Sequence, residues 1–172
     1  MLALFIAFGF AVHDLTTHHK AATTASPPAS GGLHTGLQAP AGVVGASFGL
    51  NDGSGNTYQV TLVKVIDPAS TPGSGKRIVG LVFRIKGTGG TLQGEDADRD
   101  AAVVGANGQD YQSDLKGVAG YGHFDDGAIQ LSAGETVTGA VAVPVPSSVP
   151  VSTIQWTALS GNGPMVEWIV QT

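Results

Sequence analysis

The feature that most constrains the fold is the run RIVGLVFRIK at residues 77–86, in which apolar side chains recur at every second position. A period of two with β-branched residues is typical of a strand that buries one face. Similar short runs, separated by Gly, Asn, Asp and Pro, recur from residue 43 to the C-terminus without a helical period. Roughly seven or eight short strands at this spacing predict an all-β sandwich. The alternation assigns one face of 77–86 to Val79, Leu81, Phe83 and Ile85, and the other to Ile78, Gly80, Val82, Arg84 and Lys86.

The turn residues agree with a protein built of strands. Asn107-Gly108 lies between two short apolar runs, and this pair is favoured in type I′ hairpin turns. Pro144, Pro146 and Pro150 cannot donate a ladder hydrogen bond, so they indicate an extended crossover rather than a central strand.

Composition excludes several classes of protein. The 172 residues include 26 Gly and 9 Pro, 42% are hydrophobic, and only 12% are charged. A disordered chain would be more charged and less apolar, so we expect a folded core. The formal net charge of −5 and the scattered Lys and Arg provide no basic surface for nucleic acid. The absence of Cys excludes a disulfide framework and a lipid-modified Cys.

The chain is predicted to have three parts. Residues 1–12, MLALFIAFGFAV, are uncharged and apolar over a length that fits an export signal better than a membrane span, although the sequence leaves open whether the segment is cleaved or anchors the protein. Residues 13–42 have the small, polar, Pro- and Gly-rich composition of a flexible linker. Residues 43–172 are predicted to form the sandwich. We therefore expect an extracellular or cell-surface protein that contacts a membrane only through its N-terminal segment.

The acidic segment EDADRD at 95–100 is the sharpest local feature. Glu95, Asp96, Asp98 and Asp100 could offer oxygen ligands to calcium, although the EF-hand pattern is absent. Charge runs usually lie on the surface, so the preferred interpretation is a solvated loop in which Arg99 offsets part of the charge. These four residues are therefore only weak metal candidates, and we predict no cofactor.

Other candidate residues have ordinary structural explanations. Ser47 lies in GASFG, which matches the nucleophile-elbow pattern of hydrolases, but the following NDGSGN cannot start the helix that an elbow needs. His123 lies near acidic residues and could act as a general base, yet no nucleophile pattern accompanies it. Trp156 and Trp168 are centred in two predicted strands, where core packing is expected. No catalytic residue is predicted.

A succession of segments resembles a known family. The segments are TYQVTLVKVID (57–67), RIVGLVFRIKGTGG (77–90), VVGANGQDYQ (103–112), LSAGETVTGAVAVPVP (131–146) and MVEWIVQ (165–171). In order and spacing they resemble the telokin-like, immunoglobulin-like domain of unknown function of exported actinobacterial and Gram-positive proteins. A secreted mycobacterial immunogenic antigen belongs to the same superfamily. The resemblance implies an antiparallel immunoglobulin-like β-sandwich, export and no established enzymatic activity, with no functional residues to transfer.

Three functions are compatible with these observations. The leading hypothesis is a non-catalytic, secreted or surface-displayed binding or structural module with an extracellular or cell-envelope protein as its partner. The alternative is a calcium-dependent adhesion or sensing module that uses the acidic segment. The least favoured is a small serine hydrolase built on Ser47 or His123.

Overall fold

The computed structural model describes residues 39–113, 117–124 and 128–171. The apolar segment 1–12 and residues 13–38 of the predicted linker lie outside these described residues. No helix in the described ranges has the length and apolar character that a membrane crossing requires.

The first sheet has the strand order β1-β11-β10-β6-β7. Its neighbours are antiparallel except for β1, which runs parallel to β11. Burial alternates along 153–157 of β10 and along β11, as the sequence predicted for strands with one face in the core, while the pairing of β10 with β6 is irregular between Val151 and Thr153. The strands are β1 (Ala41–Val43), β6 (Ala101–Gly105), β7 (Asp110–Gln112), β10 (Val151–Thr157) and β11 (Met165–Ile169).

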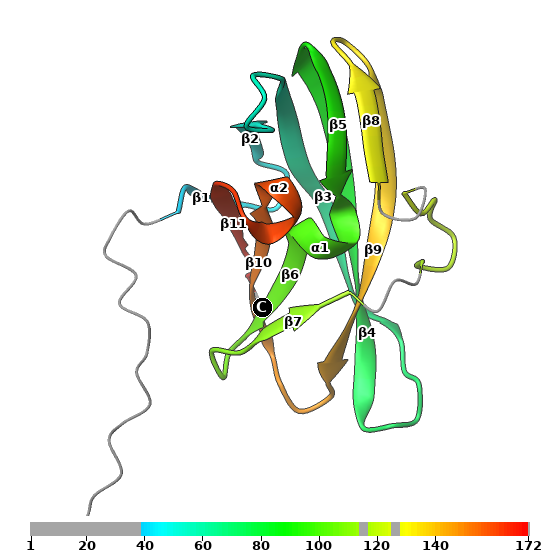
Figure 1. Ribbon diagram of the computed structural model, residues 1–172. Helices are drawn as coiled ribbons and strands as arrows, with labels where there is room; N and C mark the ends of the chain where they lie inside the picture. Colours follow the sequence, from blue (N-terminus) through cyan, green and yellow to red (C-terminus); the bar gives the residue numbers. More distant parts are fainter. Residues whose placement is uncertain (1–38, 114–116, 125–127, 172) are drawn as a thin grey trace, which may run out of the picture. The chain divides into compact units, whose positions relative to one another are not determined.

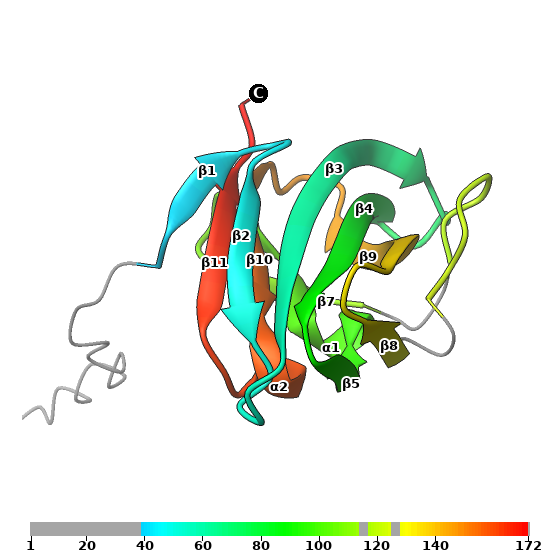
Figure 2. The same cartoon turned by 90° about the horizontal axis from the view of Figure 1, so that it is seen from above.

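The second sheet has the order β2-β3-β4-β9 and is antiparallel throughout. Seen from above, it forms a layer facing the first sheet, which gives an immunoglobulin-like β-sandwich (Figure 1, Figure 2). Pro144 and Pro146 lie inside β9 rather than in a crossover, and this is tolerated because β9 is an edge strand. The strands are β2 (Ser47–Asn51), β3 (Thr57–Ser70), β4 (Lys76–Gly89) and β9 (Thr136–Pro146).

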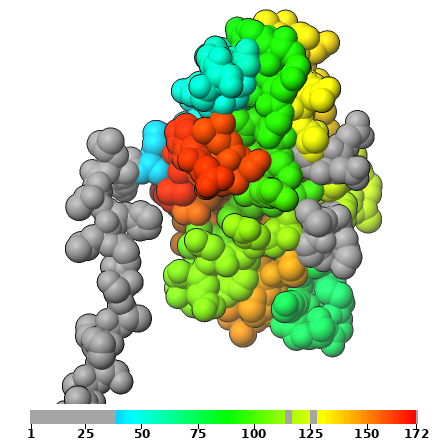
Figure 3. Space-filling model, in the orientation of Figure 1, coloured from blue at the N-terminus to red at the C-terminus, as the bar shows by residue number. Residues whose placement is uncertain are grey.

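A two-stranded sheet and two short helices lie beside these layers. The small sheet pairs β5 (Thr91–Asp96) with β8 (Ala128–Ser132). Helix α1 (Ala97–Asp100) leads from β5 into β6, and helix α2 (Ala158–Gly161) connects β10 to β11. The two helices contact each other, and Figure 3 shows α2 in orange-red beside the green residues of β5 and α1. The sequence predicted none of these four elements.

The main core lies between the two large sheets. Phe83 on β4 is fully buried, as predicted, and its ring meets Trp156 and Trp168 edge-on at centroid distances of 5.0 and 5.9 Å. Both Trp side chains are fully buried, which confirms the core-packing interpretation. Edge-to-face contacts of this kind stabilise a fold by about 0.5–1.5 kcal/mol each, in addition to the free energy gained by burying the ring surfaces.

A second, smaller apolar cluster lies on the outer face of the second sheet. Val82, Ala140 and Ala142 point away from the main core and are covered by Val118 from the segment 117–124. Gly80 permits this cover, since a Cβ there would lie 3.1 Å from both methyl carbons of Val118. Ala140 also donates its backbone N–H to the Gly122 carbonyl at 2.8 Å.

Two details differ from the sequence-based expectations. The hairpin between β6 and β7 is present, but its turn is not type I′, because Gly108 has positive φ and Asn107 does not. The first sheet starts at Ala41, inside the predicted linker, because Ala41 and Gly42 pair with β11.

Candidate functional site

The acidic segment 95–100 forms the end of β5 and helix α1. Asp96 caps the helix by accepting a hydrogen bond from the Asp98 N–H at 3.1 Å, and Arg99 pairs with Asp96 at 3.3 Å. Glu95, Asp98 and Asp100, however, are only 1%, 3% and 1% exposed. The prediction of a solvated loop is therefore wrong for these three carboxyl groups, because tertiary contacts with residues far along the chain bury them.

Glu95 and Asp100 form a buried carboxyl pair beneath α2. Burial, a hydrogen bond with Glu95 and the charge of Glu95 together raise the pKa of Asp100 to about 9. Burial likewise raises the pKa of the neighbouring Tyr58, whose hydroxyl accepts a hydrogen bond from Trp156 Nε1 at 3.3 Å. With its pKa raised, Asp100 keeps a proton and can donate a hydrogen bond to Glu95, which a carboxylate cannot do.

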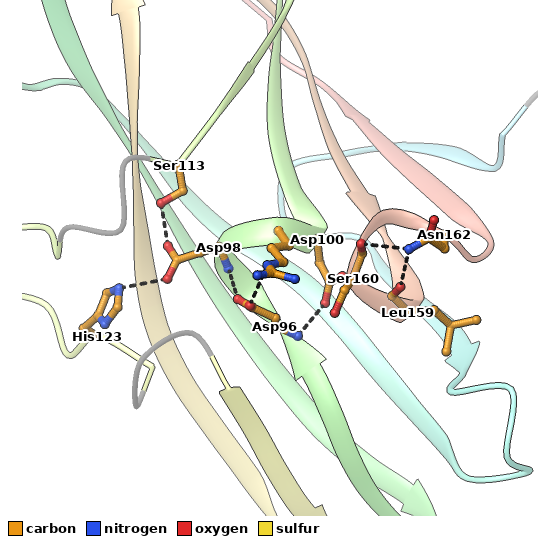
Figure 4. Close-up of polar contacts among 9 residues, drawn as sticks. Asp96, Asp98, Asp100, Ser113, His123, Leu159, Ser160 and Asn162 are labelled. Carbon is orange, nitrogen blue, oxygen red and sulfur yellow. Dashed lines mark hydrogen bonds and ion pairs between the residues drawn. The ribbon is translucent and has the colours of Figure 1, made fainter.

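The carboxyl pair braces an unusual turn at α2. Leu159 and Ser160 have φ of 60° and 51°, a left-handed conformation that non-glycine residues rarely adopt. The Leu159 N–H donates to Glu95 Oε2 at 3.0 Å. Asn162 Nδ2 donates to the Leu159 and Ser160 carbonyls at 3.3 Å (Figure 4). The buried Glu95 carboxylate thus satisfies a backbone N–H in a strained connection, which is a structural role.

Asp98 faces the opposite way, toward Ser113 and His123. Its Oδ1 accepts a hydrogen bond from Ser113 Oγ at 2.5 Å, and its Oδ2 lies 3.4 Å from His123 Nε2 (Figure 4). The carboxylate stands between serine and histidine, whereas nucleophilic catalysis needs the imidazole next to the hydroxyl. The acidic residues that prompted the general-base hypothesis for His123 include 125 and 126, which lie outside the described residues.

The four calcium candidates do not converge. Glu95 and Asp100 point to one side of α1 and Asp98 to the other, while Asp96 is engaged by the helix N-terminus and Arg99. Across 39–113, 117–124 and 128–171, no three His, Asp or Glu side chains are grouped so that they could hold one metal ion. The arrangement therefore lends no support to the calcium-dependent module.

Ser47 is not at a strand-to-helix turn. It lies within the edge strand β2, and its Oγ is 2.7 Å from Thr61 Oγ1 on the neighbouring strand. A nucleophile elbow needs a strained turn that leads from a strand into a helix. The context that gives GASFG its catalytic meaning is therefore missing.

An apolar groove of about 530 Å³ opens on the outer face of the second sheet, beside the smaller apolar cluster. Small-molecule sites commonly have about 300–1,000 Å³ and a mainly apolar lining with a few polar groups. The polar side chains here are Lys76, Ser70 and Ser74 from the β3–β4 hairpin at the lower right of Figure 1. Apolar lining comes from Ala69, Ile78, Val118, Ala142 and Pro144.

A second hollow on the same face is polar. It measures about 270 Å³ and is lined by Ser47, Gln59, Thr61, Arg84, Lys86 and Thr136. One sheet face therefore carries an apolar groove toward the β3–β4 hairpin and a polar, cationic hollow toward β2.

Neither hollow was predicted from the sequence. One signal for them was present in the sequence, because alternation within 77–86 placed Ile78, Val82, Arg84 and Lys86 on one face. The structure turns this face away from the main core. The closure of the apolar groove by residues 117–119 depends on contacts over long sequence distances, which alternation within one strand does not reveal.

Comparison with known proteins supports the fold. No family model matches the sequence, and no curated protein matches it. Among solved structures, the chain is similar to the secreted protein MPT63 of Mycobacterium tuberculosis, with a TM-score of 0.57, 14% identity, and coverage of 78% of this chain and 100% of that one. It is also similar to an uncharacterized β-sandwich protein of Clostridium difficile 630, with a TM-score of 0.47, 14% identity, and coverage of 78% and 95%.

The predicted fold class is confirmed: the described part of the chain is an all-β, immunoglobulin-like sandwich. At 14% identity, the likeness to MPT63 concerns the fold alone. The narrower resemblance to the telokin-like family stays a prediction.

Proposed function

We propose that the protein is a non-catalytic binding module that works outside the cell and holds an amphipathic ligand, an apolar chain ending in a carboxylate, in the apolar groove. The groove on the outer face of the second sheet is the observation that carries this proposal. The sequence also led us to expect an extracellular or cell-envelope protein partner. That partner stays a separate prediction.

The lining of the groove favours an apolar ligand body. The side chains of Ile78, Val118 and Ala142 belong to an apolar cluster that the segment 117–124 covers only in part. Removing the remaining apolar surface from water gains about 25 cal/mol per Å². A flexible hydrocarbon chain has the shape and chemistry to occupy such a groove.

Lys76 favours a carboxylate at one end of that ligand. It is exposed, it lines the groove, and it takes part in none of the ion pairs formed within the described residues. The adjacent Arg77, by contrast, is already bound to Asp67 at 2.5 Å. An acidic ligand head group would give the Lys76 ammonium a partner, which no described residue provides.

Two further observations support a non-catalytic role outside the cell. The serine and histidine singled out from the sequence lack a catalytic arrangement, since Ser47 contacts Thr61 and His123 contacts Asp98. The N-terminal apolar segment has the composition of an export signal, and the structurally similar MPT63 is a secreted protein.

The test is a binding titration of the full chain with decanoate, with decanol as the uncharged analogue. We expect saturable decanoate binding that is weakened by Ala69→Phe, which fills the groove, and by Lys76→Gln, which removes the cation. Ala133→Phe and Arg99→Gln are matched controls, because both residues are exposed and lie outside the groove lining.

Absence of decanoate binding, or binding that Ala69→Phe leaves unchanged, would refute the groove as the site. Equal affinity for decanol and decanoate would refute the role of Lys76. Unchanged melting temperatures of the variants would show that any loss of binding is local.

A further inference from the structure

The polar hollow is built by adjacent strands in register. Arg84 on β4 is aligned with Thr61 on β3 and Thr138 on β9. Two residues further along, Lys86 is aligned with Gln59 and Thr136. Side chains two apart on a strand point to the same face, so the two cations stand in neighbouring rows of hydroxyl and amide groups.

Both cations lack a carboxylate partner in the described part of the chain. The ion pairs formed there are Arg77–Asp67, Arg99–Asp96 and His123–Asp98, and none includes Arg84 or Lys86. The full chain has a net charge of −5, so acidic residues are plentiful elsewhere. The two positive charges, two residues apart on one strand, repel each other. An anion placed between them would offset this repulsion energy.

The remaining lining consists of uncharged hydrogen-bonding groups. Ser47, Thr61 and Thr136 offer hydroxyls, and Gln59 offers an amide. Only the Ser47 and Thr61 hydroxyls have a described side-chain partner, each other, at 2.7 Å. A hydroxyl can donate one hydrogen bond and accept two, so this pair keeps capacity for a ligand.

We propose that this hollow binds an acidic glycan, with a uronate carboxylate held between Arg84 and Lys86 and sugar hydroxyls bonded to Thr61, Gln59 and Thr136. The site goes beyond the proposed function, because its ligand and its residues differ from those of the apolar groove. Single-stranded nucleic acid fits less well, since no aromatic ring lines the hollow for base stacking. A lipid surface fits less well too, since no apolar side chain lines it.

The experiment is calorimetric titration of the full chain with a galacturonate tetramer, and with its methyl-esterified, uncharged form as the neutral probe. We expect the acidic tetramer to bind, and its affinity to fall as salt rises from about 50 to about 200 mM, because screening weakens exposed charge pairs. Arg84→Gln should weaken binding about tenfold, which is the size of a charged hydrogen bond. Lys86→Gln should weaken it in the same direction.

Arg99→Gln is the matched control, because it removes an exposed cation outside the hollow. Its affinity for the tetramer should equal that of the unmodified chain. Unchanged melting temperatures of Arg84→Gln and Lys86→Gln would confirm that their folds are intact, as expected for exposed strand residues.

Four results would overturn the proposal. They are no binding at about 10 mM tetramer, equal binding of the esterified probe, binding that neither Arg84→Gln nor Lys86→Gln weakens, and equally tight binding of a uridine oligonucleotide. The decanoate titration does not depend on Arg84 or Lys86, so the failure of one proposal leaves the other standing.

Discussion

Asp100 is a carboxyl group that the fold keeps protonated near neutral pH. Burial next to Glu95 raises its pKa to about 9, because a second negative charge in that enclosed space is unfavourable. Asp52 is the opposite case. A hydrogen bond from the Asn56 side chain at 2.6 Å, together with the Ser54 and Asn56 backbone N–H groups, lowers its pKa.

The pKa of Asp100 predicts that stability falls as pH rises through the neutral range. The folded state keeps the Asp100 proton up to about pH 9, whereas the unfolded chain loses it near pH 4, so between these values the folded state binds more protons. Asp52, with its lowered pKa, changes stability only below this window, and Tyr58, with its raised pKa, only above it. Thermal melting between pH 5 and pH 9 at constant ionic strength should therefore show a decreasing melting temperature.

Asp100→Asn is the control for this effect. An Asn oxygen can still accept from the Asp96 N–H, and its amide can donate to Glu95 without a titrating proton. The pH dependence should flatten in this variant. A melting temperature that is constant or rises between pH 5 and pH 9 in the unmodified chain would contradict the assignment.

At the scale of elements, alternation predicted the long strands well. The two faces of β4 were assigned correctly, because a strand's period of two can be read within one segment. The pair β5–β8, both helices and the burial of Glu95 and Asp100 could not be predicted in this way. They depend on partners such as Leu159, which is 64 residues from Glu95.

The close contact of Gly87 on β4 with the end of β8 and the turn into β9 leads to a prediction. Gly87 donates to the Glu135 carbonyl at 3.0 Å, and a Cβ at this position would collide with the Ser132 carbonyl oxygen. Because that neighbour is backbone, it cannot rotate away, and Gly87→Ala should destabilise the fold by about 1–3 kcal/mol in denaturant unfolding.

Gly49→Ala provides the matched comparison. It also lies in a strand of the second sheet, but a Cβ there would meet no heavy atom within 4 Å. Its free energy of unfolding should change by less than about 0.5 kcal/mol. Equal losses at both positions would show that the Ser132 carbonyl does not lie against Gly87 as described.

At the scale of the whole molecule, the buried carboxyl groups of 95–100 stabilise the fold, and the described residues form no group that could hold a calcium ion. Glu95 and Asp100 brace α2, while Asp98 bonds Ser113. Millimolar calcium should therefore leave the melting temperature unchanged relative to a chelator. A ligand at a hundred times its dissociation constant would add about 2.7 kcal/mol, which is a shift of several degrees. Such a shift, if Asp98→Asn abolished it, would restore the calcium-dependent module.

The central claim is that the outer face of the second sheet is the binding surface of this sandwich. The most direct measurement is the change in amide and methyl NMR signals of the full chain during a decanoate titration. We expect the largest changes at Ile78, Val118 and Ala142, which line the apolar groove, and little change at Val103 and Ile154 in the main core. The absence of changes at the groove residues, or changes centred on the first sheet, would contradict the claim.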